Sequence, residues 1–207
     1  MSRRRRVWYP GAFYHVMSRG NGRNVIFNER GDFHRFLDIM KEEKEKHPFT
    51  MHAMCLMSNH FHFLIECHDT ELSVIMRNIL VKYAKDYNFR YEHTGHVFEN
   101  RYKAYLIDDD SYFLEVSRYI HLNPVNAYMV AKPLDYDYSS YHCYCDNIPV
   151  SADQRARKLI SDMVTTDRVL GYFRNKSKEK YRYFVEDMPL HEKYEQQIQK
   201  DIKEDDM

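Results

Sequence analysis

The stretch HFHFLIE at residues 60–66 constrains the fold of this chain more than any other segment. It alternates histidine with phenylalanine and then continues with apolar residues, a pattern typical of a strand. Successive strand side chains point to opposite faces, so His60 and His62 share one face roughly 6.5–7 Å apart, while Phe61 and Phe63 share the other. The sequence therefore predicts a strand with one polar side and one core side.

The segments around this strand predict an α+β fold. Period-two patterns predict strands over 7–19, 49–56 and 101–106, and helical spacing predicts helices from Asn28 or Asp32 to His47, from Leu72 to Phe89 and from Asp108 to Asn123. Residues 57–59 are few enough to join two strands in a hairpin. We expect Pro48 and Pro124 to end the helices that precede them. The order strand, helix, strand, strand, helix, strand, helix indicates a mainly antiparallel sheet with helices packed on it.

The C-terminal third has a different character from the rest of the chain. After about Cys145 strand signals become rare, and helical spacing predicts helices over 152–163, 167–173 and 176–185, followed by a highly charged end. We therefore divide the chain into a main domain, residues 1–145, and a helical C-terminal extension with an acidic tail, residues 146–207.

The charge of the chain is balanced overall but uneven along it. The 31 basic residues equal the 31 acidic residues in number. From Glu186 onward eight residues are acidic and three are basic, which leaves a net charge of +5 on the first 185 residues. A mildly basic body is compatible with binding to phosphate groups, although a solvated charged surface explains the same numbers.

Other features of the sequence favour a cytoplasmic protein. No apolar run approaches the ~20 residues that a membrane-spanning helix needs. No apolar segment follows Arg3–Arg6, so the N-terminus lacks the pattern of a secretory signal. The four cysteines are spread through a chain of ordinary size and do not form a disulfide framework, which indicates a reducing environment.

Two patterns could carry chemistry, and each has a simpler explanation. Neutral imidazole is a common metal ligand, so His60 and His62 could bind a metal, but two ligands are too few for most sites and a hydrogen-bonded pair is equally compatible. Tyr119 and Asn123 lie four residues apart on one face of the expected helix. They could be a nucleophile beside a third ligand, or a surface tyrosine and a C-terminal asparagine cap.

Together, these patterns resemble the HUH single-tyrosine transposases, which include the insertion-sequence transposases. Four segments carry the resemblance in the expected order: YHVMSRGN at 14–21, HAMCLMSNHFHFLI at 52–65, GHVFENRYKA at 95–104 and SRYIHLNPV at 117–125. The pattern is most similar to the REP-associated tyrosine transposases, the branch associated with repeated extragenic palindromes, and covers about residues 10–145.

The resemblance implies a ferredoxin-like antiparallel sheet with the histidine pair on a central strand. It also implies a metal-dependent endonuclease and strand transferase that acts on single-stranded DNA. Tyr119 would be the nucleophile and would form a 5′-phosphotyrosine intermediate. His60, His62 and Asn123 would hold magnesium or manganese, and no nucleotide cofactor is implied.

The expected partner is single-stranded or hairpin DNA. The basic residues that match the pattern and are expected to bind it are Arg19, Arg23, Arg101 and Lys103. Glu66 shares the histidine face and is either a carboxylate near the site or an exposed residue at the strand end. Members of this class include both monomers and homodimers, and the sequence is compatible with either.

Three departures from the family pattern keep a second function open. Ser58 stands where proline often precedes Asn-His, and Asn126 and Tyr128 stand where arginine and glycine are common. Without that arginine, a phosphate contact expected from the family pattern is in doubt. The alternative is therefore a non-catalytic DNA-binding or regulatory protein derived from a transposase, and a hydrolytic nuclease that uses water is a weaker third hypothesis.

Overall fold

A four-stranded antiparallel sheet lies at the centre of the computed structural model, which describes residues 7–146, 148, 150–188 and 191–203. Its strands are β1 (Phe13–Arg19), β2 (Phe49–Leu56), β3 (His60–Cys67) and β4 (Lys103–Ile107). Their order across the sheet is β2-β3-β1-β4, so β1 and β3 are the two central strands. Together with the helices that connect the strands, this is the ferredoxin-like arrangement, and the expected fold class is confirmed.

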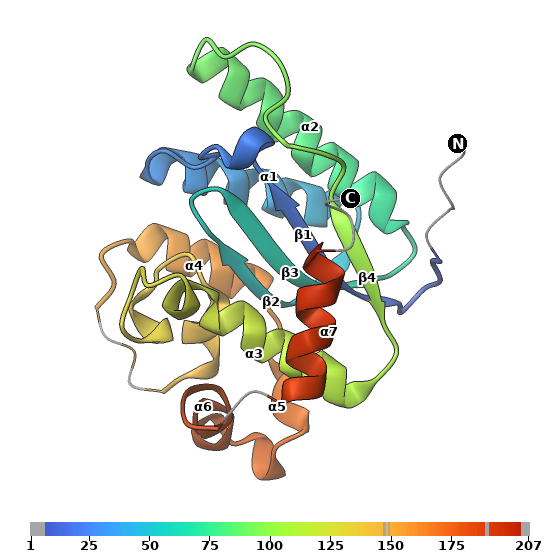
Figure 1. The fold of residues 1–207 in the computed structure, drawn as a ribbon, viewed down its shortest axis with the longest axis vertical. Helices are drawn as coiled ribbons and strands as arrows, with labels where there is room; N and C mark the ends of the chain where they lie inside the picture. Colours follow the sequence, from blue (N-terminus) through green and yellow to red (C-terminus); the bar gives the residue numbers. More distant parts are fainter. Residues whose placement is uncertain (1–6, 147, 149, 189–190, 204–207) are drawn as a thin grey trace.

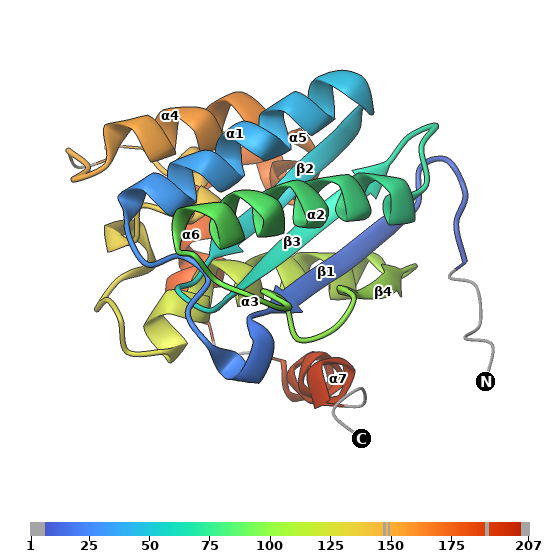
Figure 2. The same ribbon diagram turned by 90° about the horizontal axis from the view of Figure 1, so that it is seen from above.

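Helices cover both faces of the sheet (Figure 1). Figure 2 shows α1 (Arg30–Lys46) and α2 (Leu72–Arg90) on one face and α3 (Asp110–Asn126) on the other. The other α-helices are α4 (Gln154–Met163), α5 (Asp167–Gly171), α6 (Lys178–Glu186) and α7 (Glu192–Lys203). Short 3-10 helices are η1 (Asn21–Arg23), η2 (Pro133–Asp135), η3 (Ser140–Tyr144) and η4 (Arg174–Lys176).

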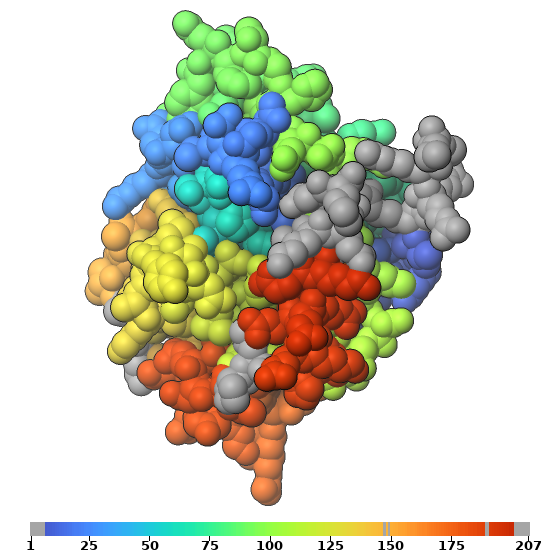
Figure 3. Space-filling model, viewed as in Figure 1, coloured from blue at the N-terminus to red at the C-terminus, as the bar shows by residue number. Residues whose placement is uncertain are grey.

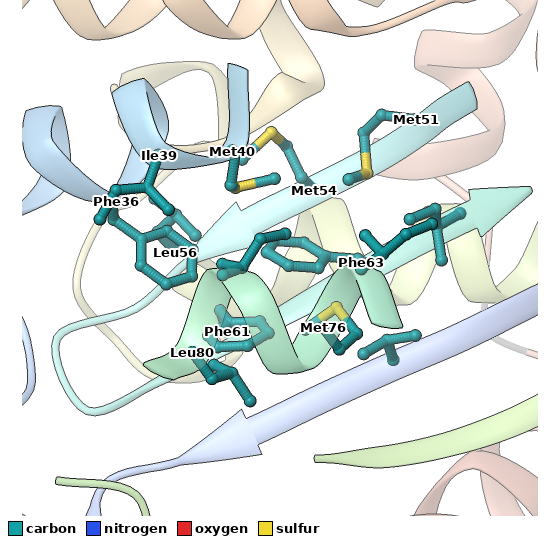
Figure 4. Packing of buried hydrophobic residues seen from close by; sticks show 14 of the residues in the cluster. Phe36, Ile39, Met40, Met51, Met54, Leu56, Phe61, Phe63, Met76 and Leu80 are labelled. Atoms are coloured by element: carbon teal, nitrogen blue, oxygen red, sulfur yellow. The ribbon is translucent and has the colours of Figure 1, made fainter. Parts of the chain in front are cut away.

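The main hydrophobic core lies between the sheet and the pair α1 and α2. Figure 4 shows Phe61 and Phe63 of β3 among apolar side chains from α1, β2 and α2, and both phenylalanines are fully buried. The buried residues of α2 are the ones that its helical spacing predicts: Leu72, Ile75, Met76, Ile79, Leu80 and Tyr83. The apolar face of β3 thus forms the sheet side of this core.

A second core lies on the opposite face of the sheet, where α3 packs between the strands and the C-terminal helices. Phe113, Val116 and Ile120 of α3 are buried there together with Ile198 of α7. Tyr181 of α6 is fully buried, and its hydroxyl lies 2.7 Å from Nδ1 of His121. In the space-filling view α7, in red, forms much of the surface on this side (Figure 3). The C-terminal helices therefore hold α3 against the sheet.

The structure corrects several expected boundaries. β1 begins at Phe13, and β4 spans 103–107. The N-cap of α1 is Glu29, because it forms a capping box in which Asp32 is the third helical residue. In the part of the chain that the structure describes, no helix combines the length and apolar character needed to cross a membrane.

The expected end of α3 at Asn123 is also wrong, because the helix continues through Pro124 to Asn126. Proline lacks an amide hydrogen and so removes one helical hydrogen bond. The surrounding bonds persist, since the amides of Ala127 and Met129 donate to the carbonyls of Asn123 and Pro124, each at 3.0 Å. Pro124 therefore lies in the last turn of α3, and Asn123 is a helical residue rather than a cap.

Candidate active site

The pairing of β1 with β3 places the two histidines beneath α3. His60 lies opposite Arg19 and His62 opposite Met17 in the antiparallel register. The ring of Tyr119 stands edge-on to the ring of His62, with centroids 5.5 Å apart and an interplanar angle of 88°. Nε2 of His60 lies 3.2 Å from Oδ1 of Asn123. The structure thus brings His60, His62, Tyr119 and Asn123 together.

A chain of hydrogen bonds fixes which nitrogen of His60 carries the proton. The amide Nδ2 of Asn59 donates to the carbonyl of Arg23 at 3.1 Å. Because that carbonyl can only accept, Oδ1 of Asn59 is the atom that faces Nδ1 of His60, 2.7 Å away. Nδ1 of His60 must therefore be the donor, and Nε2 of the neutral ring carries a lone pair that points toward Asn123.

Two hydrogen-bond acceptors therefore face each other across the 3.2 Å between His60 and Asn123. Burial lowers the pKa of His60 to about 4, so the imidazole is neutral at physiological pH. The amide group of Asn123 donates to Tyr119, which turns its carbonyl oxygen toward His60. A cation between the two acceptors would remove their repulsion.

The separation of these atoms fits a divalent metal. Magnesium binds its ligands at 2.0–2.1 Å in octahedral geometry, so neighbouring ligands lie about 3 Å apart. Among the described residues no cluster of three His, Cys, Asp or Glu side chains is placed to hold a metal. The candidate set of His60, His62 and Asn123 instead combines two imidazoles with an amide oxygen, a mixture that also suits manganese.

Tyr119 is held as a neutral phenol. Burial raises the pKa of Tyr119 to about 12, and the hydrogen bond from Asn123 and the positive charge of Arg19 offset only part of this rise. A phenol is a weak nucleophile until it loses its proton. Additional positive charge near the hydroxyl would therefore be needed to activate Tyr119 at neutral pH.

Three of the four predicted DNA-binding residues lie together. Arg19, Arg101 and Lys103 line one hollow at the end of β1, beside Glu99 and Asn100. Arg23 lies apart in η1, and it contributes to the site through its carbonyl, which holds Asn59. Glu66 lies away from the site and pairs with His52, its Oε2 3.1 Å from Nε2.

Sequence reasoning missed two side chains at the site. Asn59 precedes His60 directly, and its role depends on the turn that brings the Arg23 carbonyl within reach. His15 is fully buried on β1, and its Nε2 lies 3.1 Å from Nδ1 of His62. Residues 15 and 17 share a face of any strand, but only the pairing of β1 with β3 places His15 beside His62.

Comparisons with known proteins find relatives of this chain by sequence and by fold. The family model described as "Transposase IS200 like" matches residues 9–123. The chain is 27% identical over 119 residues to a predicted REP-associated tyrosine transposase of Haemophilus influenzae, covering 52% of this chain and 67% of the relative. Its fold is similar to that of a REP-associated tyrosine transposase solved bound to a REP hairpin, with a TM-score of 0.58 and 18% identity over 73% of this chain and 96% of the other.

We predict that metal binding changes little between pH 7.5 and pH 5.5. Burial lowers the pKa of His60 to about 4 and that of His62 well below its ordinary value, so both rings stay neutral and able to bind metal across this interval. Calorimetric titration with manganese should give affinities within about twofold of each other. Two imidazoles with the ordinary pKa of about 6.5 would each be roughly 90% protonated at pH 5.5, and a loss of about a hundredfold in a protein that is still folded would contradict the prediction.

Proposed function

This chain belongs to the IS200-like transposase family, and from that premise we propose that it cleaves and rejoins single-stranded DNA next to a hairpin through a covalent bond to Tyr119. The observation that carries the proposal is the placement of Tyr119 and Asn123 of α3 over the histidines of β3. A tyrosine nucleophile beside candidate metal ligands suits transfer of a phosphoryl group.

The reaction we propose balances without an outside source of energy. The phenolic oxygen of Tyr119, having lost its proton, forms a bond to phosphorus while the bond from phosphorus to the 3′ oxygen breaks. The 3′ oxygen takes up a proton, and the 5′ phosphate remains on the tyrosine. Attack by a DNA 3′ hydroxyl reverses these steps and releases the phenol, so a strand can be joined to a new end.

Asn123 has two roles in this proposal. Its amide group donates to the Tyr119 oxygen and lowers the pKa of the phenol, while its carbonyl oxygen faces His60. The metal held by His60, His62 and Asn123 would polarise a non-bridging phosphate oxygen and offset the charge that develops there.

We further propose that the DNA backbone follows the basic hollow formed by Arg19, Arg101 and Lys103. Arg101 also lines a groove of about 710 Å³ between α2 and the segment 95–102, so the hollow and the groove adjoin. Arg77 of α2 lines the same groove. Neither Arg77 nor Arg101 forms an ion pair with another residue of the described chain. Both guanidinium groups are therefore available to phosphates. The relative solved with a REP hairpin supports hairpin DNA as the partner.

Tyr119→Phe should abolish a covalent protein–DNA adduct. The substrate is a pool of single-stranded oligonucleotides, each with a hairpin, randomised flanks and a 3′ label, so that a 5′-phosphotyrosine bond transfers the label to the protein. With manganese or magnesium present, wild-type protein should give a labelled band in a denaturing gel. Tyr128→Phe is the matched control, because Tyr128 follows the same helix and is 96% exposed.

The same gel, together with hairpin binding measured by fluorescence anisotropy, separates the three functions. A labelled wild-type band that is lost in Tyr119→Phe supports the tyrosine mechanism. Metal-dependent cleavage without a band would favour a hydrolytic nuclease. Hairpin binding without cleavage in wild-type protein, unchanged by Tyr119→Phe, would favour the non-catalytic DNA-binding alternative.

Arg77→Gln and Arg101→Gln should each weaken binding to a hairpin with a single-stranded flank. The logarithm of the binding constant falls linearly with the logarithm of the salt concentration. Each lost phosphate contact should make this negative slope shallower by about 0.7–0.9, as measured by fluorescence anisotropy. Arg155→Gln on α4 is the control, because Arg155 is exposed and pairs with Asp38. Salt slopes equal to wild type in both test variants would rule out this path for the DNA.

A further inference from the structure

His15 is a buried imidazole next to the candidate site, and the proposed reaction does not use it. It lies on β1 with none of its surface exposed. Its ring lies edge to edge with the ring of His62 and nearly parallel to it, with centroids 5.3 Å apart and an interplanar angle of 24°, and its Nε2 lies 3.1 Å from Nδ1 of His62. This contact joins the two central strands directly beneath Tyr119.

The contact between the rings decides which atom of His62 can reach a metal. Nδ1 of His62 is engaged with His15, which leaves Nε2 as the only nitrogen available to a ligand. A neutral imidazole carries one proton, on one nitrogen or the other. If Nδ1 of His62 donates to Nε2 of His15, then Nε2 of His62 carries a lone pair. If His15 donates instead, Nε2 of His62 carries the proton and cannot bind a cation.

We infer that His15 is a positioning residue that accepts a hydrogen bond from Nδ1 of His62 and thereby holds Nε2 of His62 ready to bind the metal. Histidine ligands commonly donate their second ring nitrogen to a neighbouring acceptor, which fixes the orientation of the ring and the position of its proton. Asn59 does this for His60 through an amide oxygen. His15 does it for His62 through a ring nitrogen, so each candidate ligand has its own acceptor.

His15 also supports Tyr119. The ring of Tyr119 stands edge-on to the ring of His15, with centroids 6.1 Å apart and an angle of 72°, and edge-on to the ring of His62 as well. The two nearly parallel imidazoles thus form one surface that the ring of Tyr119 contacts. The contact of Nε2 with His62 is the only side-chain hydrogen bond that His15 forms among the described residues. With Nε2 as the acceptor, the proton of the His15 ring lies on Nδ1, which is buried and has no hydrogen-bond partner among those residues.

Two substitutions separate the hydrogen bond from the packing. His15→Phe keeps a flat ring against His62 and Tyr119 but removes the acceptor. His15→Gln provides an amide oxygen that can accept from Nδ1 of His62. Manganese affinity is measured by calorimetry without DNA, and the proton position on His62 is measured by nitrogen-15 NMR with magnesium bound. His52→Gln is the control, because His52 is also buried in the sheet but pairs with Glu66.

His15→Phe should bind manganese about 10–100-fold more weakly than wild type, the range typical of losing a partner of a metal ligand. His15→Gln and His52→Gln should stay within about threefold of wild type. In wild-type protein the NMR signals should place the His62 proton on Nδ1. Circular dichroism and urea unfolding show whether each variant is folded.

This inference rests on the proposed function, but the two can fail separately. If wild-type protein binds no metal, the proposed metal-dependent reaction fails. If wild-type protein binds metal and folded His15→Phe binds it equally well, or if the His62 proton lies on Nε2 with metal bound, only the role of His15 is overturned.

Discussion

The alternation of side chains along β3 is the constraint on which the rest of the structure depends. Phe61 and Phe63 pack in the core between the sheet and the helices α1 and α2. A shift of the strand by one residue would turn these two side chains to the opposite face of the sheet. The same constraint fixes His60 and His62 on the face that α3 covers. Core packing therefore determines the geometry of the candidate site, and the C-terminal helices complete it by holding α3 in place.

The site is built from neutral groups, and this explains its chemistry. Burial lowers the pKa values of His15, His60 and His62 and raises that of Tyr119, so at physiological pH the imidazoles carry no charge and the phenol keeps its proton. In the described part of the chain, the side chains that face one another there are His15, His60, His62, Tyr119 and Asn123, and none of them is a carboxylate. Glu66 pairs with His52 instead. Such a site offers lone pairs and needs positive charge, which a divalent metal and the nearby Arg19 would supply.

Most of the fold could be predicted from the sequence, because its signals are local. The alternation in β3 and the apolar stripe of α2 specify both elements within a residue or two. The end of α3 could not be predicted, because hydrogen bonds beyond Pro124 compensate for the one that proline removes. The order of their motifs predicted that His60, His62, Tyr119 and Asn123 act together, and the structure brings these four side chains close to one another. Asn59 and His15 were missed, because their roles depend on a carbonyl and a strand pairing far away in the sequence.

A crystal structure of the protein with manganese tests the central claim most directly, because anomalous scattering locates the ion without assumptions about its ligands. We expect one strong anomalous peak within bonding distance of Nε2 of His60, Nε2 of His62 and Oδ1 of Asn123, with Tyr119 beside it. A peak elsewhere would contradict the proposed metal site. So would a Tyr119 side chain that faces the histidines neither of its own chain nor of a partner chain.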